Sequence, residues 1–270
     1  MSSMLLQRSL LAMILTAILT GFSSYLMAIS RIIMLGLALL HTVLAGGLIG
    51  IFITYNYNIP LSITTISIII TAIISLIASE IVEHGLSIDS TIGIIAAIST
   101  SLTVTFAYLD SLISPIAVST AWSYVMGLST LFSLRDIVML LVINLIVIPV
   151  VLVFKMELIY IAFDEDGARA LGLRVRLYRA LLFVLCGIIS STLAISLGVF
   201  VAHIVLATPG VIIMKLISKR VSMFHSVLLS LVIALVGYII AYIIHLPPSS
   251  GIGVVATGFL LVAQLKTQRS

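Results

Sequence analysis

Two histidines lie inside long apolar stretches, and they are the residues best placed to do chemistry within a membrane. His41 follows Arg31 by ten residues, so a helix rising about 1.5 Å per residue places it roughly 15 Å from that charge, near the bilayer midplane. His203 lies in a second apolar stretch, one to two turns before Thr208 and Pro209. An ionisable group at such a depth is a candidate site by default, and a neutral imidazole is a common metal ligand. Each ring could instead hydrogen-bond to a carbonyl or to a packed helix, and the sequence leaves both interpretations open.

A second group of chemically capable residues is acidic and ends an apolar stretch. It consists of Glu80, Glu83, His84 and Asp89, and Glu80 and His84 share a helix face if the helix continues through them. The group could receive a cation that leaves the membrane. A solvated loop is the interpretation that we prefer, because charges at the end of a span are usually solvated.

The elements that position these residues must be transmembrane helices. Of the 270 residues, 62% are hydrophobic and only 8% are charged, with a mean hydropathy of +1.37, whereas soluble domains carry roughly 25% charged residues. This composition excludes a soluble globular protein. The single cysteine, Cys186, excludes an intrachain disulfide and a zinc-thiolate cluster. We therefore expect an all-α polytopic membrane protein that forms one transmembrane domain over residues 1–270.

Charges and Pro, Gly and Asn clusters divide the chain into nine apolar stretches. They cover residues 9–30, 32–54, 60–79, 91–109, 137–154, 180–197, 198–214, 224–245 and 250–265. The segment 111–134 is less apolar and contains Pro115, Trp122 and Gly127, which favours an interfacial or re-entrant piece. The division at Gly198 is weak, so we expect about eight to nine transmembrane helices.

The basic residues predict the orientation of these helices. With the N-terminus outside, every Lys and Arg except Arg8 and Arg135 falls in a loop on the inner side, as the positive-inside rule requires. The connections between the spans leave no room for an extracellular domain. High-affinity capture of a substrate would therefore fall to another protein.

The longest polar insertion, at about 155–180, contains a short helical pattern on the predicted inner side. Asp164, Glu165 and Asp166 suit the positive end of a helix dipole, and Gly172 is a plausible C-terminal cap. Three arginines follow, at positions 174, 176 and 179. Such a segment suits a docking site for a soluble partner; an ordinary charged loop that fixes topology is the alternative.

The insertion also resembles the coupling loop of zinc/manganese-type ABC transporter permeases. The string AFDEDGARALGLRVRLYRALLFVL is similar to the F-D-x-x-x-A-x-x-x-G pattern of that family, through Phe163, Asp164, Ala168 and Gly172. The string RIIMLGLALLHTVLAG resembles an early family segment that contains a helical Asp and His. The matching residues there are Arg31, Gly36, Ala38, Leu39, His41, Leu44 and Gly46.

Further similarities follow in the family's order along most of the chain. They are the D-x-x-I-G-I stretch from Asp89, the segment LGVFVAHIVLATPG and the closing HLPPSSGIGVVATGFLLVA. The chain differs where the family has Asp four residues before the helical His, since Leu37 stands there, and where the family has Ser, since Leu40 stands there. An Asp and a His four apart share a helix face and can bind one cation. Here His203 could supply the missing second ligand, and two imidazoles favour zinc over manganese.

The resemblance implies a permease subunit of an ATP-driven importer for divalent metal ions, zinc or manganese. It implies a homodimer in the plasma membrane, a cytoplasmic ATPase subunit and an extracellular substrate-binding protein. Phe163, Asp164, Glu165, Ala168 and Gly172 would contact the ATPase, and His41 and His203 would line the metal path. The chain has no G-x-x-x-x-G-K-[ST] stretch, so we expect ATP and Mg²⁺ on the ATPase, no cofactor here, and only transient binding of the transported ion.

Three alternatives remain at this point. The loss of the family Asp at Leu37 leaves open a permease for a chelated metal of the siderophore or cobalamin type. A secondary transporter would work without an ATPase, but it would not explain the docking-like loop. An intramembrane hydrolase lacks support, because the sequence has no H-E-x-x-H motif and no evident catalytic pair within a span.

Overall fold

Each apolar stretch of the sequence forms a helix, because a backbone in lipid must satisfy its own hydrogen bonds. The computed structural model describes residues 3–57, 59–113, 119, 132–216 and 222–267, and every regular element in these ranges is an α-helix. The helices are α1 (Ser3–Ile29), α2 (Ile33–Tyr57), α3 (Ile63–Glu83), α4 (Ile88–Ile113), α6 (Leu134–Phe163), α7 (Glu165–Ala170), α8 (Val175–Leu197), α9 (Val199–Leu216), α10 (Met223–Ile243) and α11 (Pro248–Thr267). The predicted all-α fold is confirmed.

Eight of the described helices are long and apolar enough to cross a membrane, and α9 adds a shorter apolar segment, Val199–Lys215. This agrees with the expected eight to nine spans. Several helices extend beyond the predicted stretches: α3 continues to Glu83, α6 to Phe163, and α8 begins at Val175. Hydropathy marks the apolar part of a helix, whereas backbone hydrogen bonding continues into its polar flank. The segment predicted as re-entrant, 111–134, lies largely outside the described residues.

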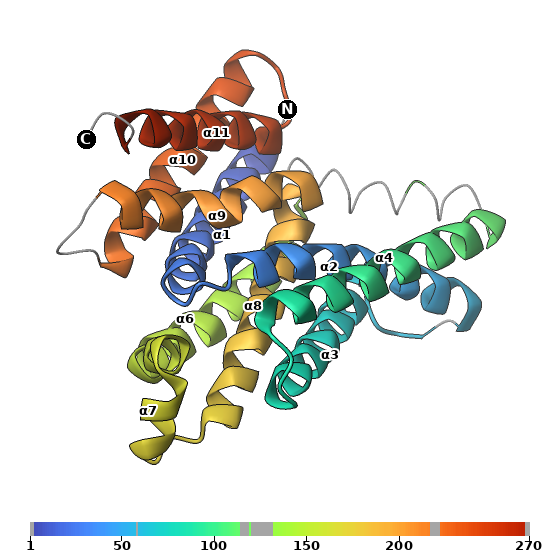
Figure 1. Ribbon diagram of the computed structural model, residues 1–270. Coiled ribbons are helices and arrows are strands. Elements are labelled where there is room, and N and C mark those ends of the chain that lie inside the picture. Colours follow the sequence, from blue (N-terminus) through green and yellow to red (C-terminus); the bar gives the residue numbers. More distant parts are fainter. Residues whose placement is uncertain (1–2, 58, 114–118, 120–131, 217–221, 268–270) are drawn as a thin grey trace.

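Two groups of helices share α8 between them (Figure 1). In this view α2, α3 and α4 lie together on one side, and α9, α10 and α11 lie on the other, with α1 packed against α9 and α10. α8 contacts both groups, through α3 and α2 on one side and α9 and α1 on the other. A change in the position of α8 would therefore be felt by both groups.

Hydroxyl groups join α2 to its neighbours at close range. Ser67 of α3 donates from Oγ to the carbonyl of Val43 at 2.8 Å, and Thr42 Oγ1 lies 2.6 Å from Ser99 Oγ of α4. A Cβ added at Gly46 would lie 3.0 Å from the Cα of Ser67, so glycine permits the close approach. Small residues and interhelical hydrogen bonds are the usual means by which helices associate in membranes.

Three connections meet at one end of the helices, which we call the α7 end. The guanidinium carbon of Arg31, between α1 and α2, lies 5.6 Å from the ring centroid of Phe163 at the end of α6. Glu80, near the end of α3, pairs with Arg176 at the start of α8, with 2.8 Å between Oε2 and Nη2. The α1–α2, α3–α4 and α6–α8 connections therefore share one surface, and α7 lies in the last of them.

Candidate functional site

The two histidines singled out in the sequence meet in the fold. The ring centroids of His41 on α2 and His203 on α9 are 5.2 Å apart, with an interplanar angle of 67°. His41 lies about two turns into α2, roughly 12 Å from its first residue, and α9 brings His203 to the same level. The sequence could not predict this contact, because it depends on how the two helix groups pack.

The hydrogen bond of His203 sets which ring nitrogen is available. Its Nδ1 lies 2.7 Å from the carbonyl oxygen of Val199. A carbonyl oxygen only accepts, so Nδ1 carries the hydrogen and the neutral ring keeps a lone pair on Nε2. A backbone bond of this kind fixes the tautomer of many metal-binding histidines. His203 therefore has the form that a metal ligand requires.

Both rings lie at an open face of the described chain. His41 is exposed and His203 is half-buried, while Met34 on α2 and Phe200 on α9 beside them are 64% and 74% exposed. Leu37, one turn before His41, is half-buried and supplies no ligand atom. Among the described residues no three or more His, Cys, Asp or Glu side chains form a potential metal cluster. The pair therefore places two imidazole rings side by side within an apolar surface, where two ring nitrogens could serve as ligands.

The helix α9 that carries His203 is fastened to α1 further along. Pro209 has no N–H and cannot bond the carbonyl of Val205 in the preceding turn. The next residue, Gly210, donates its N–H to Ser24 Oγ of α1 at 2.8 Å, and a Cβ on Gly210 would collide with the Ser24 backbone. At its other end α9 follows Gly198, whose φ of 82° breaks the helix from α8.

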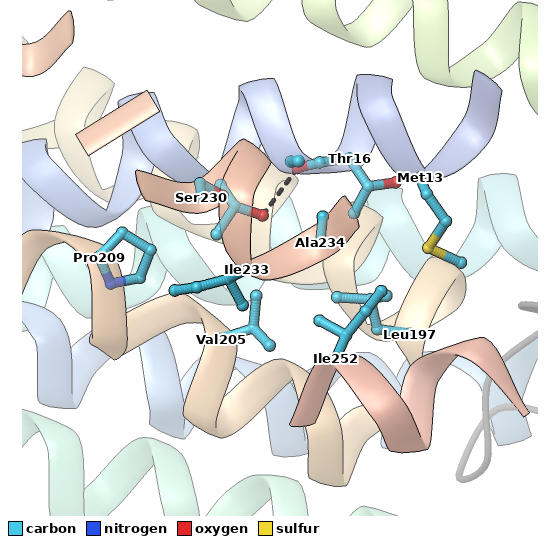
Figure 2. Close-up of a pocket in the computed structure, with 11 residues that line it drawn as sticks. Met13, Thr16, Leu197, Val205, Pro209, Ser230, Ile233, Ala234 and Ile252 are labelled. Atoms are coloured by element: carbon cyan, nitrogen blue, oxygen red, sulfur yellow. Dashed lines mark hydrogen bonds between the residues drawn. The ribbon is translucent and has the colours of Figure 1, made fainter. Parts of the chain in front are cut away.

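A small cavity lies beside Pro209, between α1, α9, α10 and α11 (Figure 2). Its volume is about 10 Å³, and its lining includes Thr16, Val205, Pro209, Ser230 and Ile252. This is room for about one water molecule. The cavity has no titratable side chain in its lining, so it belongs to the packing of α9 and not to a chemical site.

The predicted short helix of the polar insertion is present as α7, six residues long. Asp164 caps it by accepting the N–H of Gly167 at 2.9 Å, and Ala168 is fully buried against Ile161 and Val175. Phe163, the first residue of the pattern that resembles the family's coupling loop, is the last residue of α6 and precedes the short helix. Gly172 has a φ of 80°, the left-handed conformation in which glycine ends helices.

The exposed apolar residues around α7 form a groove. Met156, Phe163 and Leu171 are 73%, 57% and 70% exposed, and they line the groove together with Tyr160 and Leu173. Asp164 is also exposed. The surface around α7 is therefore both apolar and acidic. The sequence indicated its acidic part but not the apolar groove beside it.

Sequence reasoning missed the partners of the acidic cluster. Glu80 and Glu83 do not form a free solvated loop; they pair with Arg176 and Arg179 of α8. The Nδ1 of His84 lies 2.8 Å from the backbone carbonyl oxygen of Glu80, so this ring is directed to the backbone of its own helix. The only signal was the repeated three-residue spacing in 80/83 and 176/179.

A buried carboxylate was also missed. Asp110 on α4 is 1% exposed, and neither carboxylate oxygen has a hydrogen-bond partner in the part of the chain that the structure describes. It stands near the end of α4 opposite the α7 end. Among the described residues it belongs to no group of three or more His, Cys, Asp or Glu side chains, so we assign it no site.

Comparison with known proteins agrees with this fold and these motifs. The model of the ABC 3 transport family matches residues 2–267. The manganese transport system membrane protein MntC of Halalkalibacterium halodurans is 27% identical over 209 residues, which are 76% of this chain and 67% of that protein.

Two solved structures share the fold. PsaBC from Streptococcus pneumoniae in complex with Fab matches 96% of this chain and 90% of the compared chain, at 22% identity and a TM-score of 0.77. An inward-facing conformation of a candidate metal-chelate type ABC transporter matches 98% and 78%, at 19% identity and a TM-score of 0.62. Since the family match spans nearly all of a chain whose fold and motifs agree with it, this protein is a multi-pass membrane subunit that belongs to the ABC 3 transport family.

Proposed function

We propose that this chain is the permease subunit of an ATP-driven importer of divalent metal ions, with zinc preferred over manganese. The observation that carries the proposal is the contact between His41 and His203, whose ring centroids are 5.2 Å apart. A tetrahedral ion bound about 2.0–2.1 Å from one nitrogen of each ring would hold the two centroids roughly 5 Å apart. The separation therefore suits two ligands of one ion.

The type of ligand supports zinc. Imidazole suits zinc, whereas carboxylates suit manganese better, and Leu37 occupies the position at which the family pattern has Asp. The name of the relative MntC denotes manganese transport, so both ions belong in the test. The transported ion would bind only transiently, because a path must also release it.

A homodimer would complete the site. A polar ring within a span is costly unless it faces protein or water, and His41 is exposed on the single chain. Two nitrogen ligands are also too few for a four-coordinate ion. A second copy placed against the α2 and α9 face would cover the rings and enclose a path between the two chains.

The remaining partners are proposed from the family and from the surface around α7. A cytoplasmic ATPase subunit would bind ATP and Mg²⁺ and dock at Phe163, Asp164, Glu165 and Gly172, within a cytoplasmic loop at about 155–180. Ala168, which was expected to contact the ATPase, is fully buried and would instead hold α7 against Ile161 and Val175. An extracellular substrate-binding protein would deliver the ion, so transport would run inward. The whole chain would form one permease domain in the plasma membrane, with its N-terminus outside as the distribution of Lys and Arg predicts.

Metal-stimulated ATPase activity tests the proposal. The chain is reconstituted in proteoliposomes with its ATPase and binding protein, and stimulation by zinc, manganese and a metal chelate is measured. We compare the native chain with His41→Ala and His203→Ala, and His225→Ala is the control, because His225 is exposed at the start of α10. We expect zinc to stimulate the native and control chains, and either path variant to lose at least tenfold in apparent zinc affinity.

Other outcomes would point to the alternatives. Stimulation by the chelate alone would favour a permease for a chelated metal, and ion uptake without the ATPase would favour a secondary transporter. If both path variants respond to zinc as the native chain does, the assignment of His41 and His203 is wrong.

A further inference from the structure

One arginine joins the short helix α7 to α3 and α8. The side chain of Arg179, near the start of α8, is 9% exposed. Its Nη1 donates to Glu83 Oε2 of α3 at 2.5 Å, and its Nη2 donates to Glu165 Oε1 of α7. A single planar guanidinium thus holds carboxylates from two other helices, a geometry that a lysine cannot reproduce.

A second ion pair runs beside the first. Arg176 donates from Nε and Nη2 to Glu80 of α3, at 2.8–3.1 Å. Because residues three apart share a helix face, the pairs 80–176 and 83–179 form two rungs between α3 and α8. The first rung is exposed and the second is largely buried, so the Arg179 rung is the stiffer one.

The helix α7 depends on such contacts for its position. With six residues it is too short to be stable by itself. Two contacts hold α7 against other helices: Ala168 packs against Ile161 and Val175, and Glu165 forms an ion pair with Arg179 of α8. A force applied to α7 is therefore passed to Arg179 and, through the same guanidinium, to α3.

Both helices joined by the rungs hold the segment of α2 that carries His41. From α3, Ser67 bonds the carbonyl of Val43. From α8, Ser190 Oγ donates to the carbonyl of Gly36 at 3.0 Å. These two carbonyls lie on either side of His41 along α2. A displacement shared by α3 and α8 must therefore carry His41 with it.

We propose that Arg179 is the positioning residue that makes α7, α3 and α8 move as one body, so that movement of α7 displaces His41. The proposal rests on the proposed function, in which a partner ATPase moves α7. Without Arg179 the ATPase would still bind and hydrolyse ATP, but the resulting movement of α7 would no longer be transmitted to His41 on α2. The defect would be a loss of coupling and not a loss of assembly.

Transport stoichiometry tests this in the reconstituted complex. We compare zinc ions transported per ATP hydrolysed for the native chain, for Arg179→Met and for Glu83→Gln. Arg174→Met is the matched control, since Arg174 is exposed at the same end of α8 and forms none of these ion pairs. We expect Arg179→Met to lower the ratio about tenfold with basal ATPase activity retained, and Glu83→Gln to lower it less. A ratio within twofold of native for Arg179→Met overturns the proposal.

A distance measurement tests the same proposal without any transported ion. Spin labels at Asp166→Cys on α7 and His84→Cys at the end of α3, in a Cys186→Ser background, report the separation of the two helices. We expect a narrow distance distribution with Arg179 and a distinctly broader one with Arg179→Met; equal widths overturn the proposal. If the labels behave as expected but the native complex does not transport metal, the proposed function fails and the mechanical role of Arg179 stands.

Discussion

The two rungs between α3 and α8 differ in burial, and this predicts very different effects on stability. Breaking a buried ion pair by removing one partner costs about 3–5 kcal/mol, whereas an exposed pair contributes about 0.2–1 kcal/mol. The Arg179 side chain is 9% exposed and its partners Glu83 and Glu165 are 27% and 39% exposed. We therefore reduce the cost of Arg179→Met to about 2–4 kcal/mol, because water screens the carboxylates in part.

The exposed rung serves as the internal comparison. The side chains of Arg176 and Glu80 are 66% and 42% exposed, so Arg176→Met should cost less than about 1 kcal/mol. With about 2–4 °C per kcal/mol for chains of similar size, we expect Tm to fall by roughly 5–15 °C for Arg179→Met and by no more than about 4 °C for Arg176→Met. Because both variants replace an arginine of α8 by methionine, a difference between their Tm values reports the effect of burial and not the loss of a charge.

The assay uses the only cysteine of the chain. Cys186 on α8 is fully buried, so a fluorogenic thiol reagent reacts when the helix bundle opens and reports Tm in detergent. Adding Glu83→Gln to Arg179→Met should recover part of the lost stability, because the unpaired carboxylate is a large part of the cost. Equal falls in Tm for Arg176→Met and Arg179→Met, or no recovery in the double variant, would refute the reasoning.

Two further predictions concern α2. Leu37→Asp places a carboxylate one turn before His41, on the same helix face, and should raise the preference for manganese relative to zinc about tenfold, or ~1.4 kcal/mol. Competition between the two ions for uptake measures this preference. An unchanged ratio of manganese to zinc uptake contradicts the prediction. Gly46→Val should lower stability by about 1–3 kcal/mol, since its Cβ would meet Ser67 at 3.0 Å. Gly93→Val on α4, where a Cβ meets nothing within 4 Å, is the control in the thiol assay, and equal losses would show that the α2–α3 contact does not decide the effect.

The elements of the fold were predictable because lipid leaves the chain few choices. Each apolar stretch in the sequence became a helix, and the acidic start and glycine end of α7 were visible as local signals. Helix ends were harder to predict, since α3 and α6 continue through charged residues beyond the ends of the predicted apolar stretches, to Glu83 and Phe163. Local patterns therefore revealed which helices exist but not how far they extend.

Contacts between distant helices could not be predicted. Nothing near His41 in the sequence indicates that His203 packs against it, because the contact depends on how α9 crosses α2. The pairing of Glu83 with Arg179 was hidden for the same reason, and the acidic cluster was therefore taken for a solvated loop. The three-residue spacing shared by 80/83 and 176/179 is compatible with two ion pairs, but these form only because α3 packs against α8.

Because α9 is hydrogen-bonded to α1, the two histidines are held in place by different helices. Ser24 and Gly210 join α9 to α1, and Gly198 interrupts the helix between α9 and α8. His203 is thus anchored to α1, while the segment of α2 that carries His41 is held by α3 and α8. Under the proposed function, a shift of α3 and α8 by an ångström or two relative to α1 would move the His41 imidazole away from the ion while His203 keeps its place. The transported ion would then be released by the loss of one ligand, with no change in the protonation of either ring.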